Sequence, residues 1–322
     1  MSEFSRRRFL QAVSVTASAT ALGLVGCDGN SNSRQPNVPP QGPLSIVLSD
    51  ATFPQGVASG DPRPNAVLLW SRIDGAVGDV ALRVQVATDA AFTQRIVDTT
   101  MSARSANDHC LKVRVLGLQP GRNYWYRFLR ETDLSILSSP IGRTRTARDL
   151  TDATPLRFAF ISCNDYIGSY WNTLISLLDQ DLDFVLHLGD SIYETTGDPL
   201  FQSGGGGRDI AFRQPNEALR LGSGSGTFLA ARTLDNYRDL HRAYRADPVM
   251  KQLYQRFPVV AIWDDHEFSD DCWRDNGTYR DGRADERDPE RRRSAEQAYF
   301  EYTPVDLDAG GMAGAVEVGR DR

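Results

Sequence analysis

Hydrophobic and polar residues alternate along much of the chain between residues 45 and 147. In residues 80–86 and again in residues 111–115, an aliphatic residue occupies every second position. This period of two is typical of strands that bury one face. Further strand candidates, at residues 66–73, 123–129 and 136–146, are separated by proline and glycine turns. The spacing predicts a small β-sandwich over residues 45–148.

The pattern changes after residue 148. Residues 156–162 and 184–188 are mainly apolar, and residues 170–180 between them have the period of a helix. Such an order predicts a βαβ unit with a buried parallel sheet. Later candidates follow the same α/β pattern: helices at residues 234–244, 249–256 and 288–302, and a buried strand at residues 257–263. Residues 149–322 are therefore predicted to form an α/β domain.

The first residues have the character of a targeting signal. Arg6, Arg7 and Arg8 precede an uncharged segment over residues 12–25, as in twin-arginine export signals. About 14 residues are too few to span the roughly 30 Å hydrocarbon core of a membrane. Residues 24–27 resemble a bacterial lipobox, which implies lipidation of Cys27. We expect a signal over residues 1–27 that is read by the twin-arginine machinery, a flexible linker over residues 28–44, and a periplasmic or extracellular protein, with a membrane lipid anchor if Cys27 is lipidated.

Composition excludes some classes of function. The chain has 322 residues with 36 Lys+Arg and 42 Asp+Glu, a formal charge of −6, which argues against a specific nucleic-acid partner. Three cysteines follow the signal, Cys110, Cys163 and Cys272, so at least one thiol is free. No second cysteine stands at C-x-x-C spacing from Cys163, and this argues against a thiol-redox function.

Polar residues follow each of the three buried strands of the α/β domain. The three segments are Cys163-Asn164-Asp165, Gly189-Asp190-Ser191-Ile192-Tyr193-Glu194 and Asp264-Asp265-His266-Glu267. Each has an ordinary structural explanation when taken alone, because a cysteine can be a small core residue, an aspartate a cap and a tyrosine part of a core. The carboxyl ends of parallel strands meet at one edge of a sheet, however, and ligands bind there in open α/β folds. We therefore expect the three segments to converge on a metal centre.

The donor types indicate the metals. Carboxylates suit hard cations such as calcium, magnesium or manganese, whereas a thiolate and a phenolate favour a more acidic transition metal such as ferric iron. Asp190 lies beside both kinds of donor and is the natural bridge between two ions. Two metals about 3.5–4 Å apart would stabilise the attacking and leaving oxygens of an in-line displacement.

Several of these segments, together with residues 53–62 and 67–72, resemble the PhoD-type alkaline phosphatases of the calcineurin-like metallophosphoesterase superfamily. The matching segments of the second domain are Ser162-Cys163, Leu188-Gly189-Asp190-Ser191-Ile192-Tyr193-Glu194, Tyr244-Arg245-Ala246-Asp247-Pro248 and Trp263-Asp264-Asp265-His266-Glu267. The resemblance implies an N-terminal sandwich and an αββα catalytic domain. It also implies hydrolysis of extracytoplasmic phosphate mono- and diesters by in-line attack of a metal-bound hydroxide, with Fe³⁺ and Ca²⁺ as cofactors. Residues 116–126 separately resemble a fibronectin type III strand, so the sandwich is expected to be fibronectin III-like.

The resemblance assigns metal ligands. Cys163 and Tyr193 would bind iron, and Asp190 would bridge to calcium. Asp265 would bind the second metal, and Asp264 is a further candidate at this centre.

The resemblance also assigns catalytic groups. His266 would stabilise the phosphoryl oxygens or protonate the leaving oxygen, and Asp264 would orient His266. Arg238 and Arg245 are candidates for holding phosphate through paired hydrogen bonds, although each is also explained as a helix surface charge.

The family continues well beyond this length, so the second half of its catalytic domain is expected to be missing from this chain. Residues 310–322 are rich in glycine and charge and show no strand pattern. Half of such a sandwich would expose an apolar sheet face, which predicts poor solubility or low activity. The alternative function is a truncated, surface-anchored remnant that binds a metal or a partner with little catalysis.

Overall fold

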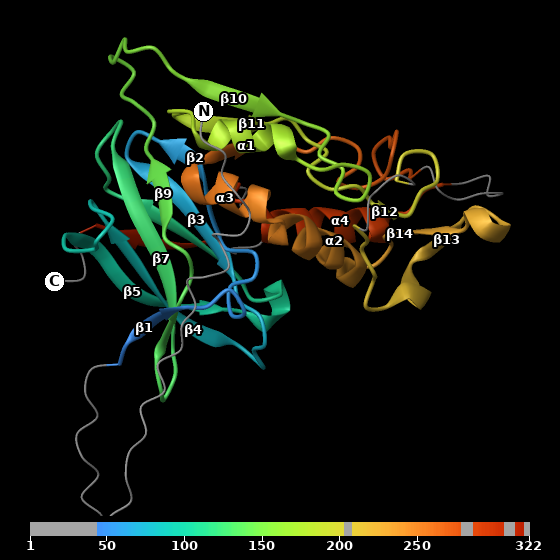
Figure 1. Cartoon of the computed structure of the whole chain (residues 1–322), viewed down its shortest axis with the longest axis horizontal. Helices are drawn as coiled ribbons and strands as arrows, with labels where there is room; N and C mark the ends of the chain where they lie inside the picture. The colour runs from blue at the N-terminus through green and yellow to red at the C-terminus, as the bar shows by residue number, and fades with distance from the viewer. Residues whose placement is uncertain (1–43, 203–207, 278–285, 306–312, 319–322) are drawn as a thin grey trace, which may run out of the picture. The chain divides into compact units, whose positions relative to one another are not determined.

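The computed structural model describes residues 44–202, 208–277, 286–305 and 313–318 (Figure 1). The expected export signal, Cys27 and almost all of the expected linker lie outside these residues. Pro43–Arg322 forms one compact unit. Among the described helices, none combines the length and the apolar character needed to cross a membrane.

The first sheet confirms the alternating pattern of the N-terminal half. Its strands run in the order β1-β8-β7-β4-β5, and β9 pairs with β7. All pairs are antiparallel except the parallel pair of β1 with β8. The strands are β1 (Ile46–Leu48), β4 (Val80–Ala87), β5 (Arg95–Ala103), β7 (Asn123–Glu131), β8 (Ile136–Ser138) and β9 (Gly142–Arg145).

The second sheet crosses the predicted boundary near residue 148. Its order is β10-β11-β15-β2-β3-β6-β16, so three strands of the N-terminal half stand between strands of the C-terminal half. These strands are β2 (Val57–Arg63), β3 (Ala66–Arg72), β6 (Cys110–Leu116), β10 (Phe158–Ile161), β11 (Phe184–His187), β15 (Val259–Ala261) and β16 (Ala313–Glu317). The predicted sandwich and the α/β half are therefore joined through one continuous sheet.

The junction between β2 and β15 requires a glycine. Gly60 pairs with Val259 in parallel register. A Cβ at Gly60 would lie 2.7 Å from the Val259 carbonyl oxygen and 2.1 Å from that of Pro304. Both distances are far inside van der Waals contact, so any side chain here would force the two strands apart.

A hydrophobic core fills the space between the two sheets of the N-terminal half. Leu69 and Val113 of the second sheet and Val84 and Phe128 of the first are all buried in one cluster. The hydroxyl of Tyr124 accepts a hydrogen bond from the Gln119 backbone N–H at 2.9 Å, a tyrosine corner of the kind found in Greek-key sandwiches. The alternating residues thus form the sandwich that the sequence predicts.

Four α-helices of the described residues pack on the C-terminal half, close to the predicted ranges. They are α1 (Asn172–Leu178), α2 (Leu234–Ala246), α3 (Pro248–Arg256) and α4 (Pro289–Tyr302). Asp247 caps α3 by accepting hydrogen bonds from the backbone N–H groups of Val249 and Met250, and Pro248 occupies the first turn. Thr233 and Asn236 form a reciprocal capping box at the start of α2.

A small third sheet lies in the long connection between β11 and α2. It consists of β12 (Thr195–Thr196), β14 (Phe228–Ala230) and β13 (Leu219–Leu221) in that order. The glycine-rich residues 222–226 connect β13 to β14. Short 3-10 helices lie at Ser105–Asn107, Pro215–Glu217 and Gly224–Gly226.

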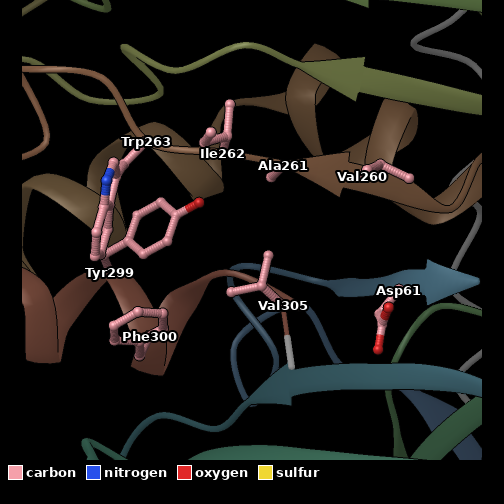
Figure 2. Close-up of a pocket in the computed structure, with 8 residues that line it drawn as sticks. All are labelled: Asp61, Val260, Ala261, Ile262, Trp263, Tyr299, Phe300 and Val305. Carbon is pink, nitrogen blue, oxygen red and sulfur yellow. The ribbon is translucent and has the colours of Figure 1, made fainter. Parts of the chain in front are cut away.

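One face of the α/β sheet is apolar and exposed. Ile161, Val185 and Val259 point into the core shared with the helices. On the opposite face Phe160 is 69% exposed and Ile262 58% exposed. A cleft of about 390 Å³ lies along this face, with Trp263, Tyr299 and Phe300 gathered at one end and Asp61 at the other (Figure 2).

The expectation of no strand at the C-terminal end is wrong for residues 313–317. This segment forms β16, which pairs in parallel with β6 from Ala313↔Lys112 to Glu317↔Leu116. Its sequence, Ala-Gly-Ala-Val-Glu, carries almost no alternating pattern. The strand forms because β6 offers a free edge of backbone donors and acceptors.

Candidate metal centre

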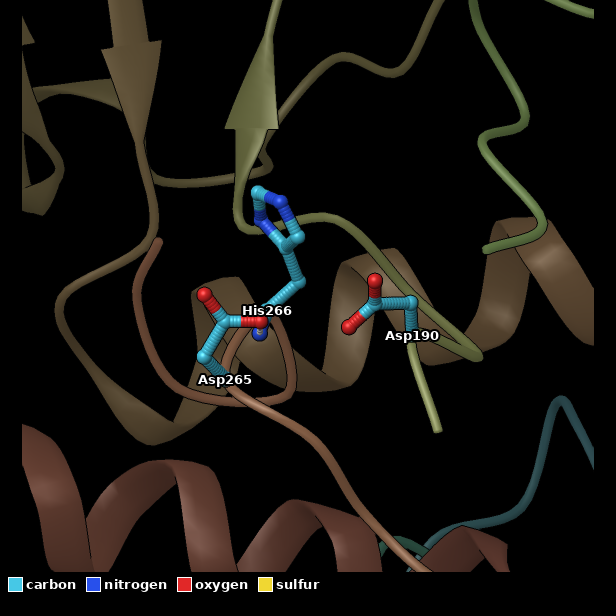
Figure 3. A group of neighbouring side chains, drawn as sticks. All are labelled: Asp190, Asp265 and His266. Carbon is cyan, nitrogen blue, oxygen red and sulfur yellow. Dashed lines mark hydrogen bonds between the residues drawn. The ribbon is translucent and has the colours of Figure 1, made fainter. Parts of the chain in front are cut away.

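The three polar segments converge, as the sequence predicts. The backbone N–H groups of Cys163 and Asn164 donate to the carbonyl oxygens of Gly189 and Asp190, at 3.3 and 3.0 Å. These bonds hold the segment after β10 against the segment after β11. Ligand atoms of Asp190, Asp265 and His266 all lie within 4.8 Å of one another, and Figure 3 shows the two carboxylates and the imidazole side by side.

Cys163 and Tyr193 adjoin this group. The Cys163 thiol interacts with the Asp190 carboxyl and with the Tyr193 hydroxyl. The Tyr193 ring lies against the His266 ring, with centroids 4.0 Å apart. Sulfur, phenol, carboxylate and imidazole donors therefore surround one small volume at the carboxyl edge of β10, β11 and β15.

Glu267 holds two of the converging segments together. Its buried carboxylate accepts hydrogen bonds from the backbone N–H groups of Asp190 at 3.0 Å, Ser191 at 2.6 Å and Asp264 at 2.8 Å, and from the Ser191 hydroxyl at 2.7 Å. Burial raises the pKa of Glu267, and the donated hydrogen bonds oppose that shift. The segments after β11 and β15 are thus tied by one side chain.

The backbone at the centre is unusual in two further ways. Gly189 has φ of +100°, and a Cβ there would lie 2.5 Å from the Asp264 backbone nitrogen. Cys163 and Asp190 adopt left-handed conformations, with φ of 55° and 52°. Such conformations cost free energy for residues other than glycine and cluster at functional sites. Here they occur at two of the candidate metal donors, Cys163 and Asp190.

His266 is oriented by Glu194. Its Nδ1 lies 2.7 Å from Glu194 Oε2, and the Glu194 side chain is fully buried. Burial alone would lower the pKa of His266, but the hydrogen bond to Glu194 and the charges of Glu194, Asp190 and Asp265 raise it to about 9. The imidazole is therefore protonated at neutral pH when no cation is bound nearby.

The donor set fits a cation. Asp190 Oδ1 is buried and has no hydrogen-bond partner among the described residues. Burial raises the pKa of Asp190, and the nearby carboxylates of Asp265 and Asp264 raise it further. Burial also raises the pKa of Tyr193 well above its ordinary range, together with the charges of Asp190 and Cys163. A bound cation would reverse these shifts by favouring the ionised forms.

A second acidic group adjoins the first. Carboxylate oxygens of Asp265, Asp270 and Asp271 lie within 4.8 Å of one another. Asp265 belongs to both groups, so it stands where a second cation would share a ligand with the first group.

Three of the sequence-based assignments need correction. Glu194, and not Asp264, makes the hydrogen bond that orients His266. Arg238 donates to Glu301 at 2.7 and 2.6 Å and to the Ala106 carbonyl, so its donors are committed in the core. Arg245 is buried, with its guanidinium 4.4 Å from the Trp70 ring centroid and 3.8 Å from that of Tyr254. Neither arginine is among the groups that converge on Asp190.

Sequence reasoning missed two carboxylates of the centre, Glu194 and Glu267. Both lie inside the segments that it singled out, one directly after Tyr193 and the other directly after His266. In the structure, their burial within polar segments indicates their roles. In the sequence, only their position just after a strand points to those roles.

A cleft of about 690 Å³ opens beside the centre. Tyr193 and His266 belong both to the centre and to the wall of this cleft. The other described lining residues come from the segment after β12 and from the β13–β14 connection: Asp198, Pro199, Leu200, Phe201, Leu221, Gly222, Gly226, Phe228 and, after β15, Asp270.

Comparisons with known proteins agree with this geometry. Residues 158–317 match the family model for PhoD-like phosphatase, and residues 41–148 match the model for the PhoD-like phosphatase N-terminal domain. Alkaline phosphatase D of Bacillus subtilis (strain 168) is 32% identical over 313 residues, covering 94% of this chain and 48% of that protein. The chain thus spans about half the length of this curated relative.

A solved structure gives the same result. A structure of PhoD superposes with a TM-score of 0.67 at 32% identity, covering 80% of this chain and 47% of that one. A purple acid phosphatase from seeds of yellow lupin, Lupinus luteus, is 9% identical with a TM-score of 0.45, covering 80% of this chain and 41% of that one. The resemblance inferred from the motifs is confirmed.

Proposed function

Because the chain belongs to the PhoD-like phosphatase family, we propose that its centre takes part in metal-dependent hydrolysis of extracytoplasmic phosphate mono- and diesters. The observation that carries the proposal is the group of Asp190, Asp265 and His266, whose ligand atoms lie within 4.8 Å. The buried, unpartnered oxygen of Asp190 in the midst of this group suits a cation.

We assign the residues as follows. Cys163, Tyr193 and Asp190 hold ferric iron, because a thiolate and a phenolate favour that ion. Asp190 and Asp265 share the second ion, calcium, and Asp270 adds a further carboxylate on that side. When bound, the two ions supply the positive charge that activates a water and offsets the charge developing on the phosphoryl group.

The remaining residues of the centre position groups and protons. His266, held by Glu194 at Nδ1, presents Nε2 to the phosphoryl or leaving oxygen and can donate a proton there. Glu267 keeps the segments that carry Asp190 and Asp265 in register. Asp264 contributes its backbone N–H to Glu267 and its charge to the field around Asp190.

The proposal includes the context of the domain. The sandwich over residues 45–148 is a fibronectin III-like module that packs against the catalytic half, which is one side of an αββα domain. Residues 1–27, with the arginines at 6–8 and Cys27, direct export through the twin-arginine pathway and lipid anchoring.

The test is metal analysis combined with hydrolysis of an aryl monophosphate and a bis-aryl phosphate. The full chain is loaded with iron and calcium, and Asp190→Asn is compared with Asp133→Asn, an exposed aspartate in the turn between β7 and β8. We expect Asp190→Asn to lose both metals and most hydrolysis, and Asp133→Asn to keep them. Unchanged iron content in Asp190→Asn would overturn the assignment.

The exposed apolar face of β10, β11 and β15 supports a second candidate, a catalytically poor, metal-binding remnant. Metal stoichiometry separates the two. The phosphoesterase requires two tightly held ions, whereas the remnant would hold at most one and would release it on dialysis.

A further inference from the structure

The cleft beside the metal centre differs sharply from the centre in chemistry. Its wall continues directly from His266 and Tyr193 into apolar side chains: Pro199, Leu200, Phe201, Leu221 and Phe228. Leu200 is 89% exposed and Phe201 38% exposed. Apolar side chains held open to water beside a polar site are a sign of a ligand-binding surface.

The aromatic rings form a continuous path from the centre into the cleft. The Tyr193 ring centroid lies 4.0 Å from that of His266 and 5.6 Å from that of Phe201. The Phe201 and His266 centroids are 6.4 Å apart. These spacings are those of packed aromatic pairs, so an organic group attached to a phosphorus at the centre would meet ring faces and edges on its way out.

Beyond the metal centre, the wall offers no positive charge. His266 and Asp270 belong to the centre, the remaining charged lining residue among those described is Asp198, and none of the described lining residues is an arginine or a lysine. An organic group that carries a carboxylate or a second phosphate would therefore gain no ion pair along this part of the wall and would meet the like charge of Asp198. An uncharged organic group has no such electrostatic penalty in this part of the cleft.

The segment that carries the apolar wall is fixed before any ligand arrives. The Gln202 side-chain amide donates to Asp165 Oδ1 at 3.0 Å and to the Thr195 carbonyl at 3.1 Å, and its carbonyl oxygen accepts from the Asp198 backbone N–H at 3.0 Å. The Leu200 backbone N–H in turn donates to Asp198 Oδ1 at 2.9 Å. A wall fixed in this way costs little ordering free energy on binding.

We propose that this cleft selects phosphate esters whose organic part is uncharged and apolar or aromatic, with Leu200 and Phe201 as specificity-determining residues. The inference rests on the proposed phosphoesterase function. It adds the substrate class, which the metal centre alone does not determine.

The test uses binding rather than turnover. Phenylphosphonate, methylphosphonate and 4-carboxyphenylphosphonate are titrated calorimetrically into the metal-loaded full chain. We expect phenylphosphonate to bind more tightly than methylphosphonate, and the carboxylated ring to bind more weakly than the plain one. Leu200→Ala and Phe201→Ala should each reduce the preference for phenyl over methyl roughly threefold to tenfold, the range for loss of an aromatic or apolar contact.

The matched control is Leu134→Ala. Leu134 is 86% exposed and lies in the turn between β7 and β8. The control therefore removes a leucine side chain of nearly the same exposure as Leu200, at a position outside the lining of the cleft. Leu200→Ala changes a residue that is too exposed to affect folding. An equal phenyl-to-methyl ratio in wild type, or the same ratio in Leu200→Ala and Leu134→Ala, would overturn the inference while leaving the phosphoesterase intact. Failure of all three phosphonates to bind would instead overturn the proposed function.

Discussion

Replacing Glu267 by alanine should both destabilise the protein and weaken its metal centre. The carboxylate accepts three backbone hydrogen bonds and one from the Ser191 hydroxyl, at distances from 2.6 to 3.0 Å. The glutamate itself is only 3% exposed, so water cannot freely replace it.

The magnitude follows from the donors left behind. A buried donor without an acceptor costs about 1–3 kcal/mol. Of the three backbone donors, only that of Asp190 belongs to a buried residue, whereas Ser191 is partly exposed and Asp264 is exposed, so both can recover water. Removal of the buried carboxylate also relieves its own desolvation cost. We therefore expect a loss of about 2–4 kcal/mol in the free energy of unfolding. Side chains that support metal ligands typically contribute 10–100-fold in metal affinity, and we expect a loss in that range.

The measurement is urea denaturation together with iron and calcium titration of the full chain. Glu290→Ala is the matched control, because Glu290 is exposed in the first turn of α4. It should change the free energy of unfolding by less than about 0.5 kcal/mol. Equal denaturation midpoints and equal metal affinities in Glu267→Ala and Glu290→Ala would refute the role of Glu267 as the tie between the segments.

The other predictions concern the core and the exposed sheet face. Burial, with the charge of Arg245, lowers the pKa of His187 to about 4 and that of His241 to about 3. As the pH falls, both histidines are therefore protonated in the unfolded chain before they are protonated in the folded one. The free energy of unfolding should fall as pH drops from about 6.5 to 4, by about 3 kcal/mol for each histidine. Denaturation curves at several pH values check this, and His241→Asn, unlike His109→Asn, should flatten the dependence. Arg238→Met should cost about 3–5 kcal/mol in the free energy of unfolding, because it leaves the fully buried carboxylate of Glu301 without its cationic partner. Thermal unfolding measures the loss, and a change in phosphate affinity without a change in stability would contradict the correction made for Arg238. Phe160→Lys should lower aggregation measured by light scattering, since Phe160 is 69% exposed on the apolar face, and Leu134→Lys should not.

The sequence predicted that the three polar segments converge, because each of them directly follows a mainly apolar strand. Strand ends are local features, and the rule that parallel strands share a carboxyl edge turns three local features into one place. The helix starts at Asp247-Pro248 and Asp288-Pro289 were predictable for a similar reason, since capping uses residues adjacent in the chain.

The structural features that could not be predicted from the sequence depend on contacts between residues far apart in the chain. Residues 57–63 contain serine, glycine, aspartate and proline, and they form β2 only because β3 and β15 stand on either side. The sequence also cannot distinguish an arginine that grips phosphate from one that pairs with a buried glutamate, as Arg238 does with Glu301. The roles of Glu194 and Glu267 likewise depend on residues more than 70 positions away.

The pairing of Gly60 with Val259 has a consequence for biosynthesis. The two residues are separated by 199 positions (259 − 60 = 199), so a ribosome must elongate the chain through most of its length before that edge of β2 gains its neighbour. Until then the nascent N-terminal half presents an unpaired strand to other chains. Pairing of residues so distant in the sequence is also slow. A chaperone bound to that edge during translation would protect the unpaired strand until β15 is available.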